Sequence, residues 1–436
     1  MQRITLFWFR RDLRLVDNHG LSQALQSGNP VLPIFIFDRN ILDELEVKAD
    51  ARLQFIFDTL EQLNHELAAY GSGLKTYFGT PEEVFRELVK TYLIELVIAN
   101  RDYEPYAIQR DKSIHALLSD HGILFKGYKD QVIMDRRDVM KADGEPYTVF
   151  TPYSRKWKEL FRQEMIDPYP VIFSADKLVQ MPRQTVMPLA ALGFKPVHQE
   201  FPAKKVEEEL IRDYQDTRNF PGIHGTSRLS VHLRFGTISI RYLVGNAFAW
   251  SATYLNELIW REFYMMILYH FPHVVNNSFR PQYDHIPWLN REDEFDAWCQ
   301  GRTGYPIVDA GMHELNETGF MHNRVRMITA SFLTKHLLID WRWGEAYFAQ
   351  KLLDYELASN NGGWQWAAGS GVDAAPYFRI FNPALQTQKF DPHNSYLDQW
   401  VPGWQSPDYP VPIVDHKAAR DRAIATFRNA LNGLTE

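Results

Sequence analysis

The sequence is poor in cysteine and contains no long apolar run. Cys299 is the only cysteine in 436 residues, so the chain cannot form an internal disulfide, and zinc sites built from several thiolates are excluded. No stretch of about 18 apolar residues occurs, and arginines at positions 3, 10 and 11 charge the N-terminus. We therefore expect neither a membrane span nor a signal peptide, and we expect a cytoplasmic protein.

Several catalytic and cofactor motifs are also missing. No glycine-rich dinucleotide fingerprint follows the first predicted strand, and no phosphate-binding loop occurs. Neither a His-Glu-x-x-His pair nor a Gly-x-Ser-x-Gly elbow is present, which argues against metal and serine hydrolases. A net charge of −7 argues against nucleic-acid binding through a generally basic surface, although a local basic patch stays open. We expect no bound metal.

The N-terminal part alternates two kinds of segment. Short runs rich in β-branched and aromatic residues predict strands at Ile4–Phe9, Val31–Phe37, Leu74–Phe78, Leu96–Ala99 and Ile123–Phe125. Apolar residues spaced by three and four from Leu53 to Leu67 predict a helix, and another should begin at Pro81. This alternation predicts an α/β domain over residues 1–130, with a doubly wound, Rossmann-like parallel sheet.

The rest of the chain has a different character. Residues 131–204 lose periodicity and gather prolines, which indicates a long connector. Residues 205–436 show helical periodicity without convincing strands and contain ten of the twelve tryptophans. The sequence therefore predicts a second, all-helical domain that makes unusual use of indole rings.

One helical segment combines an acid, a base and two aromatic rings. On a helix covering 256–264, one face carries Glu257, Trp260, Arg261 and Tyr264. The face could be a buried ion pair with packed rings, or the wall of a pocket that stacks on a flat ligand and offers it a carboxyl group.

Three further segments carry chemistry. Residues 321–327 place Asn323 and Met327 on one helix face between two arginines. This face is either a solvated edge of the helix or part of a binding site. Residues 360–366 contain Gly362 and Gly363, which permit either close backbone approach to a ligand or a sharp bend. The stretch 226–230 offers hydroxyls and backbone N–H groups at an expected helix start, which suits a phosphate or an ordinary N-cap.

Together with the opening segment Trp8–Arg14, these segments resemble the photolyase/cryptochrome family, and most closely its class I bacterial cyclobutane pyrimidine dimer photolyases. The resemblance covers nearly the whole chain. It implies an N-terminal α/β antenna domain and a C-terminal helical domain that binds FAD in a folded form.

The resemblance also implies a set of cofactor contacts. Asn360 would face N5 of the flavin, and the stretch 226–230 would meet the diphosphate. The residues implied to bind FAD are Tyr214, Thr226, Ser227, Arg228, Leu229, Ser230, Tyr254, Glu257, Arg261, Asn323, Arg326, Asp354, Tyr355, Glu356 and Asn360.

A second implied set would contact the lesion or its DNA. Trp260 and Trp366 would form walls against which a flipped-out pyrimidine pair packs, and Arg218 and Arg324 would meet phosphates. The residues implied to bind DNA are Arg218, Trp260, Tyr264, Asn323, Arg324, Met327, Trp366 and Gln386, with Arg261, Arg379 and Lys389 adding local positive charge. Trp364, Trp341 and Trp288 would relay an electron to the flavin, although ordinary core packing would explain each of them equally well.

The implied activity is light-driven repair. Reduced FAD would donate an electron to a cyclobutane pyrimidine dimer in DNA, with Glu257 stabilising the dimer radical anion by a hydrogen bond. The alternative is a cryptochrome-type photoreceptor without repair activity. Trp260 and Met327 fit the dimer-repair pattern, and the 32 residues after Trp404 leave no room for a long signalling tail. We expect a monomer that works on damaged DNA.

The presence and the identity of a second, antenna chromophore stay open. Folate-binding members of the family carry Asn-Glu after a Tyr-Glu pair, whereas here Pro105, Tyr106 and Ala107 follow Tyr103-Glu104. A deazaflavin, a flavin and a folate all remain candidates.

Overall fold

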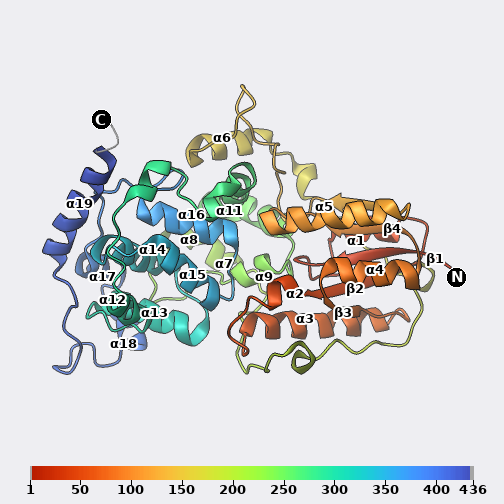
Figure 1. The fold of residues 1–436 in the computed structure, drawn as a ribbon, viewed down its shortest axis with the longest axis horizontal. Helices are drawn as coiled ribbons and strands as arrows, with labels where there is room; N and C mark the ends of the chain where they lie inside the picture. Colours follow the sequence, from red (N-terminus) through yellow and green to blue (C-terminus); the bar gives the residue numbers. More distant parts are fainter. Residues whose placement is uncertain (1, 433–436) are drawn as a thin grey trace. The chain divides into compact units, whose positions relative to one another are not determined.

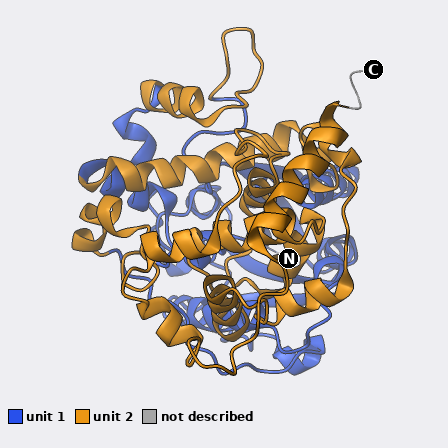
Figure 2. Ribbon diagram, turned by 90° about the vertical axis from the view of Figure 1, so that its left-hand side faces the viewer, with its two compact units in different colours: residues 1–138, 160–206, 228–249 blue, residues 139–159, 207–227, 250–436 orange. Residues whose placement is uncertain are grey.

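The computed structural model describes residues 2–432. The chain forms two compact units, each built from three segments (Figure 2). The first unit contains residues 1–138, 160–206 and 228–249, and the second contains 139–159, 207–227 and 250–436. Segments of the predicted connector, 131–204, therefore belong to both units.

A five-stranded parallel sheet forms the centre of the first unit (Figure 1). Its strands are β1 (Arg3–Phe9), β2 (Val31–Asp38), β3 (Lys75–Gly79), β4 (Leu93–Asn100) and β5 (Leu124–Tyr128). They lie in the order β3-β2-β1-β4-β5, and every neighbouring pair is parallel. All five predicted strands are present, so the doubly wound sheet is confirmed.

The helices between the strands follow their sequence signals. These helices are α1 (His19–Leu25), α2 (Arg39–Leu42), α3 (Ala51–Ala68), α4 (Pro81–Thr91) and α5 (Pro105–Asp120). The start of α4 is fixed by a capping box in which the Thr80 side chain accepts from Glu83 N and the Glu83 carboxylate accepts from Thr80 N. Alternate residues of β1, Ile4, Leu6 and Trp8, pack in one core with α4 and α5.

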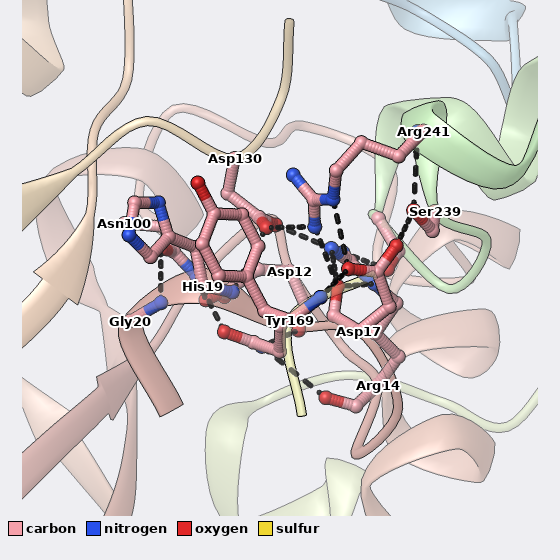
Figure 3. A network of polar contacts seen from close by, with 12 residues as sticks. Asp12, Arg14, Asp17, His19, Gly20, Asn100, Asp130, Tyr169, Ser239 and Arg241 are labelled. Carbon is pink, nitrogen blue, oxygen red and sulfur yellow. Dashed lines mark hydrogen bonds and ion pairs between the residues drawn. The ribbon is translucent and has the colours of Figure 1, made fainter. Parts of the chain in front are cut away.

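A buried polar network holds a later segment of the first unit to the loops that follow β1 and β5 (Figure 3). Arg241, in α10 (Ile240–Trp250), donates to Asp17 Oδ1 and to Asp130 Oδ1, each at 2.8 Å. Arg14 donates to the other Asp130 oxygen at 2.6 Å. Burial by itself would raise the pKa of Asp130, but the two guanidinium groups lower it below its ordinary value. Removing either arginine would leave a buried carboxylate under-compensated.

The second unit is built from helices. Its main helices are α6 (Phe150–Leu160), α7 (Glu208–Arg212), α8 (Tyr214–Thr217), α11 (Ala252–His270), α12 (Glu292–Cys299), α13 (Pro306–Thr318), α14 (Asn323–Ser331), α15 (Trp341–Lys351), α16 (Leu357–Ala368), α17 (Pro383–Phe390), α18 (Ser395–Trp400) and α19 (His416–Asn432). A π-helical turn, Phe332–His336, extends α14. No strand occurs between residues 205 and 432, so the helical character is confirmed.

Several tryptophans lie in the core of the second unit. Trp298, Trp341 and Trp364 are buried in one hydrophobic cluster, and Trp288 packs against it. Among residues 2–432, no helix combines the length and the apolar content needed to cross a membrane.

Candidate functional site

A cavity of about 450 Å³ opens in the second unit, and α11, α14, α15 and α16 contribute to its walls. It brings together most of the predicted cofactor and lesion contacts. The predicted residues that line it are Arg218, Glu257, Trp260, Arg261, Tyr264, Asn323, Arg326, Met327, Asp354, Tyr355, Glu356, Asn360, Trp364 and Trp366. The other predicted site residues do not line it: Arg324, Gln386, Tyr214, Tyr254, Trp288, Trp341 and the stretch Thr226, Ser227, Arg228, Leu229 and Ser230.

Helix α11 supplies one wall. Its N-terminus is capped by Ser251, whose hydroxyl accepts from Tyr254 N. The four residues predicted to share a face, Glu257, Trp260, Arg261 and Tyr264, all line the cavity. The face therefore borders a cavity, and it also contains the ion pairs and packed rings of the other interpretation; its role in stacking on a ligand stays a prediction.

Glu257 has a counter-ion from outside its own helix. Arg218 Nη1 lies 2.5 Å from Glu257 Oε1. Burial raises the pKa of the Glu257 carboxyl, and Arg218 opposes this rise by its charge and its hydrogen bond. Burial and the Arg218 charge therefore act in opposite directions on this carboxyl.

A second arginine, Arg324, adds positive charge near Arg218. Arg324 donates to Asn219 Oδ1 at 2.6 Å, and its guanidinium carbon lies 4.2 Å from the centroid of the Phe390 ring. Burial lowers the pKa of Arg324, and the neighbouring charges of Arg218 and Arg379 lower it further. Several guanidinium groups thus lie close enough to repel one another, an arrangement that an anionic phosphate would relieve.

Asn360 is oriented by a residue that the sequence did not point to. Its Nδ2 donates to the backbone carbonyl of Glu345 at 3.1 Å and to Glu345 Oε1 at 2.9 Å. Because a carbonyl can only accept, the amide nitrogen must face Glu345, which leaves the oxygen of Asn360 for the cavity. Burial raises the pKa of Glu345, and its hydrogen bond with Asn360 opposes the rise. Two residues on different helices create this pair, so no local pattern could have revealed it.

The two acidic residues Asp354 and Glu356, which line the cavity, are each paired with an arginine. Arg326 Nη2 donates to both oxygens of Asp354, at 3.1 and 2.9 Å, and its Nε donates to the Met321 carbonyl. Arg261 and Glu356 approach to 3.6 Å. The predicted pairing of Arg326 with Asp354 is confirmed.

The two adjacent glycines have different surroundings. A Cβ on Gly362 would lie 2.2 Å from Tyr264 Cδ1, whereas a Cβ on Gly363 would meet no atom within 4 Å. Gly363 lines the cavity, in agreement with close backbone approach. The alternative of a sharp bend is wrong, because α16 runs through both glycines without interruption.

The predicted diphosphate stretch is divided between the two units. Thr226 and Ser227 belong to the second unit, whereas Arg228, Leu229 and Ser230 belong to the first. Within the second unit, Ser227 Oγ lies 2.8 Å from Tyr254 OH, and the Tyr254 ring meets Tyr214 edge to face at 5.0 Å. Burial raises the pKa of Tyr254 to about 12. The role of the stretch in FAD binding stays a prediction.

Two aromatic residues that sequence reasoning missed touch the predicted functional indoles. Trp298 lies with its ring centroid 6.0 Å from that of Trp364. Phe150 stacks on Trp260, with centroids 3.7 Å apart and ring planes 6° from parallel. The unusual aromatic content was a general signal for such contacts, but the partners are distant in sequence.

Comparison with known proteins gives the same picture along the whole chain. Residues 5–171 match the family described as DNA photolyase, and residues 254–407 match the family described as the FAD binding domain of DNA photolyase.

Three relatives span nearly the full length. The deoxyribodipyrimidine photo-lyase of Vibrio cholerae is 38% identical, with 98% of this chain and 99% of that protein covered. A crystal structure of an archaeal photolyase from Sulfolobus tokodaii with two FAD molecules has a TM-score of 0.85 and 35% identity, covering 98% of this chain and 99% of that one. A bacterial class III photolyase from Agrobacterium tumefaciens has a TM-score of 0.84 and 33% identity, covering 99% and 98%. Identity at this level over whole chains, with the same fold, means that the chain belongs to the photolyase/cryptochrome family.

Proposed function

We propose that the protein is a light-dependent DNA repair enzyme that splits cyclobutane pyrimidine dimers. One observation carries this proposal: residues implied to hold FAD and residues implied to hold the lesion share a single cavity. An electron donor and its acceptor must lie close together for direct transfer, and one shared cavity provides this. The activity named for the Vibrio cholerae relative supports the same reaction.

The residues of the cavity fit FAD. The Asn360 oxygen is left for a polar ring edge by the hydrogen bonds to Glu345. Gly363 offers backbone without a side chain, and Arg326 remains half-buried beside Asp354. Bound there in its reduced form, FAD would supply the electron after light absorption. The chain itself orients the cofactor and excludes water.

Glu257 acts on the lesion rather than on the cofactor in this proposal. A carboxyl that carries its proton can donate a hydrogen bond to a pyrimidine carbonyl that gains negative charge. Burial shifts the pKa of Glu257 upward, toward easier protonation, and Arg218 opposes this shift. Arg218 is already paired with Glu257 and can also meet a phosphate of the bound strand. Trp260 and Trp366 supply apolar walls for a pyrimidine dimer taken out of the stack.

The decisive test is repair by the purified, reduced protein. We expect illumination with dimer-containing oligothymidylate to restore thymine absorbance, and we expect no recovery in the dark. Glu257→Ala should keep FAD but lower the repair yield per photon. Absence of repair in the parent protein would favour a photoreceptor, and equal yields in both proteins would remove Glu257 from the mechanism.

Two finer assignments remain part of the proposal. Membership of class I rests on motif resemblance, and the Agrobacterium tumefaciens structure is described as class III. A second chromophore is supported by the two FAD molecules of the Sulfolobus tokodaii structure. An absorbance spectrum of the isolated protein would reveal an extra band, and mass spectrometry of the released compound would identify it.

A further inference from the structure

The indole of Trp260 has one face covered by another ring. Phe150 lies parallel to it with centroids 3.7 Å apart, a full face-to-face contact. Phe263 meets the same indole edge to face at 5.5 Å, and Tyr264 is tilted against it at 5.4 Å. Trp260 also lines the cavity, so the face opposite Phe150 is the one left for a ligand.

Phe150 is held in place by the packing of its helix. It is the first residue of α6, and further along this helix Trp157 Nε1 donates to Glu262 Oε2 of α11 at 2.6 Å, in a buried contact. Tyr153 of α6 packs on Phe263 of α11 at 5.1 Å. These contacts fix α6 on the same helix that carries Trp260, so Phe150 is a rigid support rather than a mobile loop side chain.

We propose that Phe150 is a positioning residue that determines lesion preference by fixing the plane of Trp260. This inference rests on the proposed function, because it assigns to Trp260 a flipped-out pyrimidine pair. A stacked aromatic pair stabilises its own geometry beyond what its buried area contributes. Without Phe150, only Phe263 and Tyr264 restrain the indole, and no ring fixes its plane from one face. A ligand that packs on the indole must then restrict the added motion on binding, which costs affinity.

The test replaces the ring while keeping apolar bulk. Phe150→Leu should lower the ratio of affinities for dimer-containing over undamaged oligothymidylate by about threefold to tenfold. Binding of the undamaged strand, FAD content and repair yield at saturating substrate should stay at the parental level. Phe150→Tyr keeps a ring face and should restore the ratio.

A matched control removes a ring from another stacked pair. Phe161 lies against Phe248 in the first unit, with centroids 5.0 Å apart and planes at 24°. Phe161→Leu should leave the affinity ratio unchanged.

The inference would be overturned by a parental affinity ratio in Phe150→Leu, or by an equal loss in Phe161→Leu. Lost FAD or lost yield at saturation in Phe150→Leu would also overturn it, because the role would then be structural. A parent protein with neither preference nor repair would instead overturn the proposed function, and this inference with it.

Discussion

The adjacent glycines of α16 offer a direct test of where the cofactor lies. Both occupy a helix interior, where alanine is more favourable than glycine by about 0.8–1.0 kcal/mol. A Cβ at Gly363 meets no atom within 4 Å, so Gly363→Ala should stabilise the flavin-free protein by about 1 kcal/mol. A Cβ at Gly362 would lie 2.2 and 2.3 Å from two carbons of the Tyr264 ring, and overpacking of this kind costs about 1–3 kcal/mol. Gly362→Ala should therefore be neutral to destabilising.

The same Gly363→Ala substitution that stabilises the flavin-free protein should weaken FAD binding. If FAD packs against this backbone, the added methyl group must displace it, and we expect the dissociation constant for FAD to rise about tenfold. Denaturant unfolding of the flavin-free proteins would measure the stabilities, and fluorescence titration with FAD would measure the affinities. Parental FAD affinity in Gly363→Ala would refute the placement of the cofactor against α16. A destabilised flavin-free Gly363→Ala protein would refute the packing argument itself.

Three further predictions concern charge, DNA and electron supply. The Glu257 carboxyl can donate only when protonated, so repair yield at saturating substrate should fall as pH rises through its pKa. Arg218→Gln removes the positive charge that opposes the effect of burial on the pKa of Glu257, so the fall in yield should move to higher pH. An unchanged pH profile would contradict the pairing of Arg218 with Glu257. Arg324→Ala should weaken binding to damaged and undamaged DNA by similar factors and reduce the salt dependence of binding. Trp260→Ala should mainly remove the preference for the lesion. Filter-binding titrations measure both effects, and the opposite pattern would mean that Trp260 binds the backbone and Arg324 recognises the lesion. Trp288→Phe should slow light-driven flavin reduction by an external reductant, yet chemically pre-reduced protein should still repair dimers; unchanged photoreduction would assign Trp288 to packing alone.

Local sequence determined where the strands and helices lie and which residues share one face of a helix. The strands could be predicted because the apolar runs are short and rich in β-branched residues. The start of α4 could be predicted because Pro81 stands at its first position and Glu82 and Glu83 follow in its first turn. The wall formed by Glu257, Trp260 and Tyr264 could be predicted because residues three and four apart share one side of a helix.

Partners distant in the chain were decided only by tertiary structure. Arg218 and Glu257 are 39 positions apart, and Asn360 and Glu345 are 15 apart on different helices. Phe150 meets Trp260 only because α6 packs on α11. A sequence with 28 phenylalanines and 54 acidic residues offers many equivalent partners for each indole and each cation. Periodicity fixes which face a residue occupies, but only the packing of whole helices selects which of those partners comes within contact distance.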